Sequence, residues 1–173
     1  MTTIELVRHA EALSRDGWRD RPDWDRPLSE VGRAQAEALA RAILDGGPID
    51  GCHASPTVRC LQTLEPLAAA AGQRIVGEEA LGEAATVPST DRGNAWVASA
   101  WLGGRALSFV DRVTAARPGR RIVVCSHGDV VPALLAVLAG RDGLALPDVR
   151  LDKGGWISLR FDGGRCVDAA RHE

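Results

Sequence analysis

The chain has 173 residues, of which 45% are hydrophobic and 25% are charged, and its net charge is −2. The length and apolar content suit one globular domain over residues 1–173, and the charge gives no basic field of the kind that attracts nucleic acid. No apolar stretch is long enough to cross a membrane, and the N-terminus acquires charge too early for a signal peptide. We therefore expect a cytoplasmic protein without membrane or nucleic-acid partners.

The first part of the chain alternates between strand and helix signals. Residues 4–8 form a short run with the character of a β-strand, and residues 12–28 form a long polar loop without periodicity. Ser29 is a favourable helix N-cap, and apolar residues at helical spacing follow it as far as the Gly-Gly-Pro stop at 46–48. A second strand is predicted over residues 50–54.

A second helix is predicted directly after this strand. Ser55 as N-cap and Pro56 at the first helical position favour a helix that runs to about Ala71, with a kink or break near Pro66. The remainder is expected to contain a weak strand, two helices, a strand, a helix and a β-hairpin, over residues 74–77, 89–102, 104–117, 121–126, 130–139 and 156–169. This order predicts an α/β three-layer sandwich with a mostly parallel central sheet flanked by helices and a C-terminal β-hairpin.

Three groups of polar residues follow three of the predicted strands. These groups are Arg8-His9, the segment from Ser55 to Arg59, and His127. Ligands of open α/β sheets bind at the carboxyl ends of the strands, so we expect these side chains to meet at one edge of the sheet.

The same residues carry a resemblance to a known family. Residues 6–11 (LVRHAE), 55–63 (SPTVRCLQT) and 126–128 (SHG) resemble the three signatures of the histidine phosphatase superfamily, which includes phosphoglycerate mutases. The resemblance spans about residues 4–161. It implies an α/β fold covered on both faces and a phosphatase activity that needs neither a metal ion nor a cofactor.

The resemblance also implies roles for individual residues. His9 would attack phosphorus as a neutral imidazole and form a phosphohistidine, while Arg8, Arg59 and His127 would donate hydrogen bonds to the phosphoryl oxygens. The leaving oxygen needs a proton from a nearby acid. By resemblance this acid lies in the loop after the third strand, where Glu83 fits best.

The acid has competitors, and the long polar loop has two interpretations. Glu78 and Glu79 lie close to Glu83 in the chain and are alternative acids. In the 12–28 loop, arginines could contact a second phosphate and tryptophans could stack on a base. The candidates are Arg15, Arg19, Arg21, Arg26, Trp18 and Trp24. The alternative is that the aspartates between them neutralise the arginines in surface ion pairs worth little.

The substrate is less closely defined than the reaction. The short length and the RHA start resemble the compact bacterial phosphohistidine phosphatases and the histidine phosphatase domains that follow Nudix domains. A phosphohistidine protein is therefore the expected substrate, and a nucleotide or another phosphorylated small molecule is the alternative. Ala12 and Arg15 depart from the pattern of mutases, so mutase activity is not expected. A phosphate-binding module without catalysis remains a different class of function, and the oligomeric state stays open.

Overall fold

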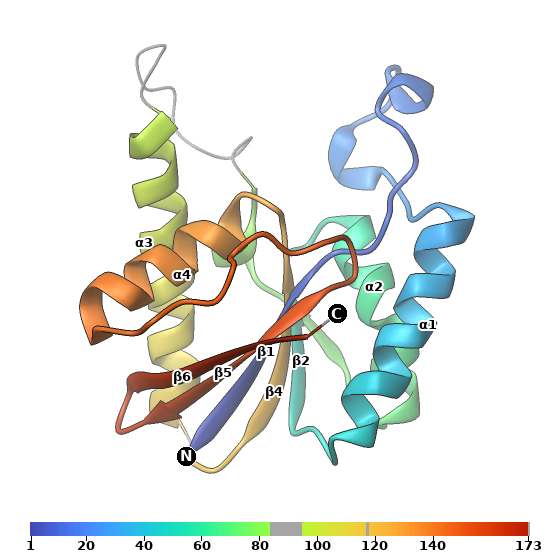
Figure 1. The fold of residues 1–173 in the computed structure, drawn as a ribbon. Helices are drawn as coiled ribbons and strands as arrows, with labels where there is room; N and C mark the ends of the chain where they lie inside the picture. Colours follow the sequence, from blue (N-terminus) through green and yellow to red (C-terminus); the bar gives the residue numbers. More distant parts are fainter. Residues whose placement is uncertain (84–94, 117, 173) are drawn as a thin grey trace.

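The computed structural model describes residues 1–83, 95–116 and 118–172. In this part of the chain, strands form one sheet in the order β3-β2-β4-β1-β5-β6 (Figure 1). The strands are β1 (Thr2–Arg8), β2 (Gly51–Ala54), β3 (Ile75–Gly77), β4 (Arg121–Ser126), β5 (Trp156–Asp162) and β6 (Arg165–His172). The neighbours from β3 to β1 pair in parallel, whereas β5 pairs antiparallel with both β1 and β6. The mostly parallel sheet and the C-terminal hairpin are as the sequence predicts.

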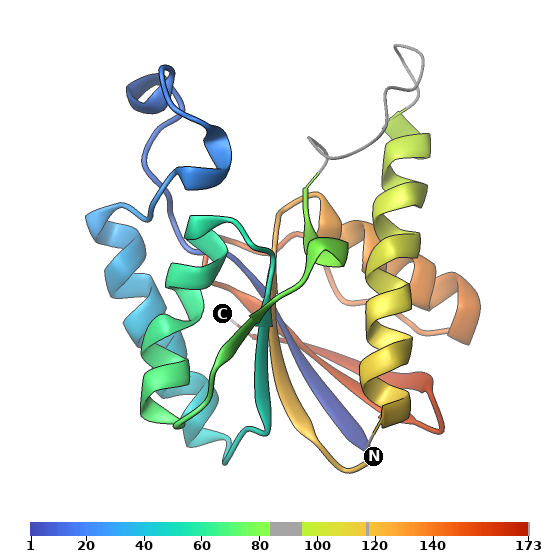
Figure 2. The ribbon, with the colours of Figure 1, turned by 180° about the vertical axis from the view of Figure 1, so that it is seen from behind.

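Helices cover both faces of this sheet. The α-helices are α1 (Glu30–Asp45), α2 (Val58–Ala70), α3 (Ala95–Ala116) and α4 (Val130–Asp142), and the short 3-10 helices are η1 (Asp16–Trp18), η2 (Asp23–Asp25) and η3 (Glu79–Leu81). The helices α1 and α2 lie together on one face, and α3 and α4 lie together on the other (Figures 1 and 2). The three-layer α/β architecture is therefore confirmed.

The central strands β1 and β4 supply side chains to two separate apolar cores. Successive strand residues point to opposite faces, so a strand covered on both faces reads as a continuous apolar run. The α3/α4 side buries Ile4, Leu6, Ile122 and Val124. The α1/α2 side buries Val7, Val123 and Cys125. The sheet between these two cores fixes the positions of the residues at the ends of its strands.

The start of α2 differs from the prediction. The helix begins at Val58 with Thr57 as its N-cap residue, rather than at Ser55 and Pro56. The Ser55 amide still donates to the Cys125 carbonyl at 3.0 Å, so the sheet pairing extends through this residue. The expected break near Pro66 is also wrong, because α2 continues through that residue to Ala70.

The two helices predicted around residues 89–102 and 104–117 are one continuous helix, α3. The predicted residues 89–94 and 117 lie outside the described residues. Two adjacent glycines, Gly103 and Gly104, lie where the first predicted helix ends and the second begins, and a Cβ atom on Gly103 would lie 2.7 Å from the carbonyl oxygen of Ala133 in α4. The first glycine therefore permits close packing between α3 and α4, which outweighs the low helix propensity of the pair.

The described residues contain no helix that combines the length and the apolar character needed to span a bilayer. The cysteines at 52, 60, 125 and 166 are buried free thiols.

Candidate active site

The predicted strand-end residues meet at one edge of the sheet. The parallel register places Arg8 opposite Ser126 and Ala54 opposite Cys125, so β1, β2 and β4 end at the same level. Residues 10–28 rise above this edge, on the opposite side from the N-terminus (Figure 1). The His9 ring lies 5.4 Å from the His127 ring, measured between centroids.

The hydrogen bonds of His9 select one tautomer. Its backbone amide donates to the Ser126 carbonyl at 2.9 Å, and its Nδ1 lies 2.7 Å from the Ala10 carbonyl oxygen. A carbonyl oxygen only accepts hydrogen bonds, so Nδ1 must carry the hydrogen and Nε2 keeps its lone pair. Burial is the largest influence on the pKa of His9 and lowers it below its ordinary value. The geometry and the environment both favour a neutral imidazole that can act as a nucleophile.

Arg8 is held beside the backbone of Gly128. Its Nη1 donates to the Leu151 carbonyl at 2.6 Å. A Cβ atom at Gly128 would lie 3.0 Å from both Cζ and Nε of Arg8, so glycine leaves the space that the guanidinium occupies. The sequence analysis assigned no role to this glycine, although the SHG motif contains it.

Arg59 is fully buried at the start of α2. Its Nη1 donates to the Asp23 carbonyl at 2.7 Å, and its Nη2 contacts Asp23 Oδ2 at 3.1 Å and also binds Glu83 Oε1. A buried guanidinium requires such partners, because an unpaired buried charge is strongly destabilising. Sequence reasoning missed Asp23, one of many aspartates in a loop whose path is not predictable from local signals.

His127 lies between Ser55 and Glu83. Its Nε2 is 2.8 Å from Ser55 Oγ, and its Nδ1 is 3.6 Å from Glu83 Oε2. Burial acts to lower the pKa of His127, but Cys60 and Glu83 outweigh it and raise the pKa above its ordinary value. A raised pKa favours the protonated ring, which donates from both nitrogens.

Three buried side-chain nitrogens at this edge have no hydrogen-bond partner among the described residues. They are Arg8 Nε, Arg59 Nε and His127 Nδ1. Buried donors are nearly always satisfied, so their common neighbourhood indicates a ligand that is rich in acceptor oxygens.

Of the two competing acids, Glu78 is separated from Glu83 by its partners, whereas Glu79 lines the same cavity as Glu83. Glu83 contacts both Arg59 and His127, whereas Glu78 lies 3.1 Å from His53 and 2.7 Å from Arg112. Glu78 is therefore engaged away from the strand-end cluster. Within the described ranges, no three His, Cys, Asp or Glu side chains are grouped as metal ligands.

The candidate residues of the 12–28 loop divide into two sets. Arg15 lies near the site, with its Nε 3.6 Å from Asp23 and its Nη2 4.0 Å from Glu83. Arg19, Arg21, Arg26 and Trp18 contact partners within the loop: Arg19 donates to Asp16 at 2.7 Å, Arg26 donates to Asp23 at 2.9 Å, and the Arg21 guanidinium lies 4.6 Å from the centre of the Trp18 ring. Trp24 lines a cavity beside the site. A contact of these residues with substrate stays a prediction.

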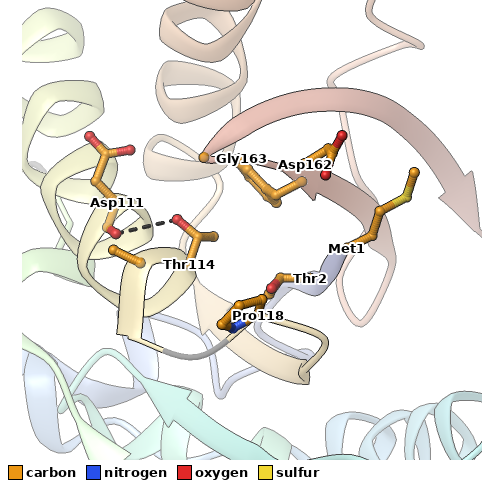
Figure 3. A pocket seen from close by; sticks show the side chains of 10 residues that line it. Met1, Thr2, Asp111, Thr114, Pro118, Asp162 and Gly163 are labelled. Carbon is orange, nitrogen blue, oxygen red and sulfur yellow. Dashed lines mark hydrogen bonds between the residues drawn. The ribbon is translucent and has the colours of Figure 1, made fainter.

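A cavity of about 370 Å³ adjoins the site. We call it the Trp24 cavity, and it is lined by Asp23, Trp24, Ser55, Pro56, Thr57, Glu79, Gly82 and Glu83. A larger cavity, of about 440 Å³, lies at the opposite edge of the sheet around Met1, Asp111 and Asp162 (Figure 3). Its described lining includes no histidine, cysteine or cationic side chain, so it lacks the groups that phosphoryl chemistry needs.

Comparisons with known proteins identify similar sequences and folds. The model of the histidine phosphatase superfamily (branch 1) matches residues 4–95 and 97–170. An 8-oxo-(d)GTP phosphatase of Mycolicibacterium smegmatis is 35% identical over 167 residues, which are 96% of this chain and 47% of that protein. The chain thus spans about half the length of this curated relative.

Solved structures of low sequence identity share the fold. A mycobacterial glucosyl-3-phosphoglycerate phosphatase aligns with a TM-score of 0.70 and 21% identity, covering 91% of this chain and 92% of the other. A phosphoserine phosphatase from Entamoeba histolytica aligns with a TM-score of 0.75 and 18% identity, covering 100% and 98%. Since the family model matches nearly the whole chain, the protein belongs to the histidine phosphatase superfamily.

Proposed function

We propose that this protein is a metal-independent phosphatase that hydrolyses a phosphomonoester or phosphoramidate through a phosphohistidine on His9. The observation that carries the proposal is the set of buried nitrogens on Arg8, Arg59 and His127 that have no hydrogen-bond partner in the described part of the chain, next to an imidazole whose Nε2 keeps its lone pair. Phosphoryl transfer requires positioning and neutralisation of charge on the phosphoryl oxygens, and these donors supply both.

The reaction proceeds in two displacements. His9 Nε2 attacks phosphorus, the bond from phosphorus to the leaving atom breaks, and that atom takes a proton from Glu83. Water then attacks the phosphohistidine, gives a proton to the Glu83 carboxylate, and the N–P bond breaks to release phosphate.

Two classes of substrate fit this reaction. One class is a phosphohistidine protein, whose modified side chain would have to reach the strand-end residues. The named relatives favour small phosphorylated molecules, since they are phosphatases of 8-oxo-(d)GTP, glucosyl-3-phosphoglycerate and phosphoserine. A non-catalytic module would bind the same ligands and release no phosphate.

The test is phosphate release in the presence of EDTA, comparing the wild type with His9→Ala. The panel contains an aryl phosphate, a sugar phosphate, nucleoside mono-, di- and triphosphates, and a histidine-phosphorylated carrier protein. We expect release that requires His9, and the preferred substrate selects between the two classes. Activity that EDTA abolishes and a metal restores contradicts the mechanism, whereas tight binding without release indicates a binding module.

The role of Glu83 is tested with a matched pair of variants. We expect Glu83→Gln to reduce kcat by about 100-fold or more, which is typical for the loss of a general acid. Glu78→Gln should have little effect on kcat, because Glu78 pairs with His53 and Arg112 instead. Equal losses in the two variants would remove Glu83 from the proposed mechanism.

A further inference from the structure

The Trp24 cavity is directly continuous with the proposed phosphate site. Ser55 and Glu83, which line the cavity, are also the neighbours of the two His127 ring nitrogens. A phosphoryl group held by His127 therefore has this cavity beside it. Its volume of about 370 Å³ falls within the roughly 300–1,000 Å³ of small-molecule sites.

The cavity offers a flat apolar surface at its rim. Trp24 belongs to η2, and its side chain is 64% exposed. Pro56 and Gly82 also line the cavity. An exposed indole beside a concave site stacks well on a planar ring, because two flat π-systems exclude water from both faces.

The charged groups of the lining are all acidic. Asp23, Glu79 and Glu83 line the cavity, and no cationic side chain is among its described lining residues. Arg59 lies behind Asp23 and Glu83 and is already paired with both. Carboxylates accept hydrogen bonds from N–H and O–H groups and repel additional anions.

We propose that the Trp24 cavity binds the leaving group of the substrate and selects a planar ring with hydrogen-bond donors and no second anionic group, as in a nucleoside monophosphate. This inference rests on the proposed function. It identifies Trp24 as the residue that stacks on the ring and Glu79 as a residue that excludes further phosphates.

Binding is measured first, by calorimetry, because it does not depend on turnover. The protein is His9→Ala, and the probes are GMP, phenyl phosphate, GTP and glycerol 3-phosphate. We expect GMP to bind more tightly than GTP and glycerol 3-phosphate. Adding Trp24→Ala should weaken GMP binding about tenfold and leave glycerol 3-phosphate unchanged, in keeping with the strength of stacking on an aromatic side chain. Phenyl phosphate has a planar ring but lacks the N–H and O–H donors of GMP. If it binds as tightly as GMP, stacking alone explains the selection, and the proposed role of the hydrogen-bond donors is wrong.

Matched controls separate these effects from general damage. Trp96 is 72% exposed on α3 and does not line the cavity, so adding Trp96→Ala should change no affinity. Glu79→Gln should narrow the preference for GMP over GTP, and Glu65→Gln, on the exposed face of α2, should not.

The outcomes are distinguishable from those of the proposed function. If GMP and glycerol 3-phosphate bind equally and Trp24→Ala affects neither, the leaving-group site is wrong. Loss of the proposed phosphatase function would show instead as an absence of His9-dependent phosphate release in the wild type.

Discussion

Replacing Asp23 with asparagine should increase the affinity of the site for phosphate. The Asp23 carboxylate lies 3.1 Å from Arg59 Nη2, at the guanidinium that we propose binds the phosphoryl oxygens. A phosphate must therefore displace this carboxylate or accept its repulsion. Asparagine keeps the size of the side chain, and the backbone carbonyl of residue 23 can still hold Arg59 Nη1 as it does now at 2.7 Å.

The size of the effect follows from the exposure of the ion pair. The Asp23 side chain is 42% exposed, so its pair with Arg59 is screened and worth about 0.2–1 kcal/mol, despite the buried partner. At about 1.4 kcal/mol per factor of ten, the affinity should rise by roughly 1.5-fold to fivefold. The assay is calorimetric titration with inorganic phosphate at constant ionic strength, since salt screens the effect.

A control in the same loop tests the specificity of this reasoning. Asp16 pairs with Arg19 at 2.7 Å and both side chains are largely exposed, so Asp16→Asn should leave phosphate affinity unchanged. A fall in affinity for Asp23→Asn would refute competition and would show that the Asp23 carboxylate positions Arg59. An equal rise in the two variants would assign the effect to the net charge of the loop.

Three further predictions concern pH and glycine packing. Because burial lowers the pKa of His9, its imidazole stays neutral to a lower pH than an ordinary histidine. The acid-side loss of kcat/KM should therefore have its midpoint below about pH 6.5. A midpoint above that value would contradict the role of His9. Gly128→Ala should lower kcat/KM by about tenfold to 100-fold with little change in Tm, since the added Cβ displaces the flexible end of Arg8. Gly103→Ala should destabilise the protein by about 1–3 kcal/mol in urea unfolding, whereas Gly104→Ala, with no atom within 4 Å of its Cβ, should stabilise it by up to about 1 kcal/mol.

Local patterns in the sequence determined the architecture and the principal candidates for the site. The strand patterns at 4–8 and 121–126 predict two strands, and β1 and β4 pair in parallel at the centre of the sheet. Because parallel strands end at a common edge, His9 and His127 could be expected to meet although 118 positions separate them along the chain. This inference needs only the side-chain period of a strand and the direction of the strands.

Only the tertiary structure determined the contacts between distant segments, because local sequence patterns do not specify how such segments are placed relative to one another. Asp23 reaches Arg59 across 36 positions of sequence, from a loop that has no periodicity. Gly103 and Gly104 lie at the junction of two predicted helices, yet only the first contacts α4, and the helix continues through both. Ser55 has the chemistry of a helix cap, but its hydroxyl lies against His127. In each case the free energy of a long-range contact outweighs a local preference worth about 1 kcal/mol, and that contact exists only once the chain has folded.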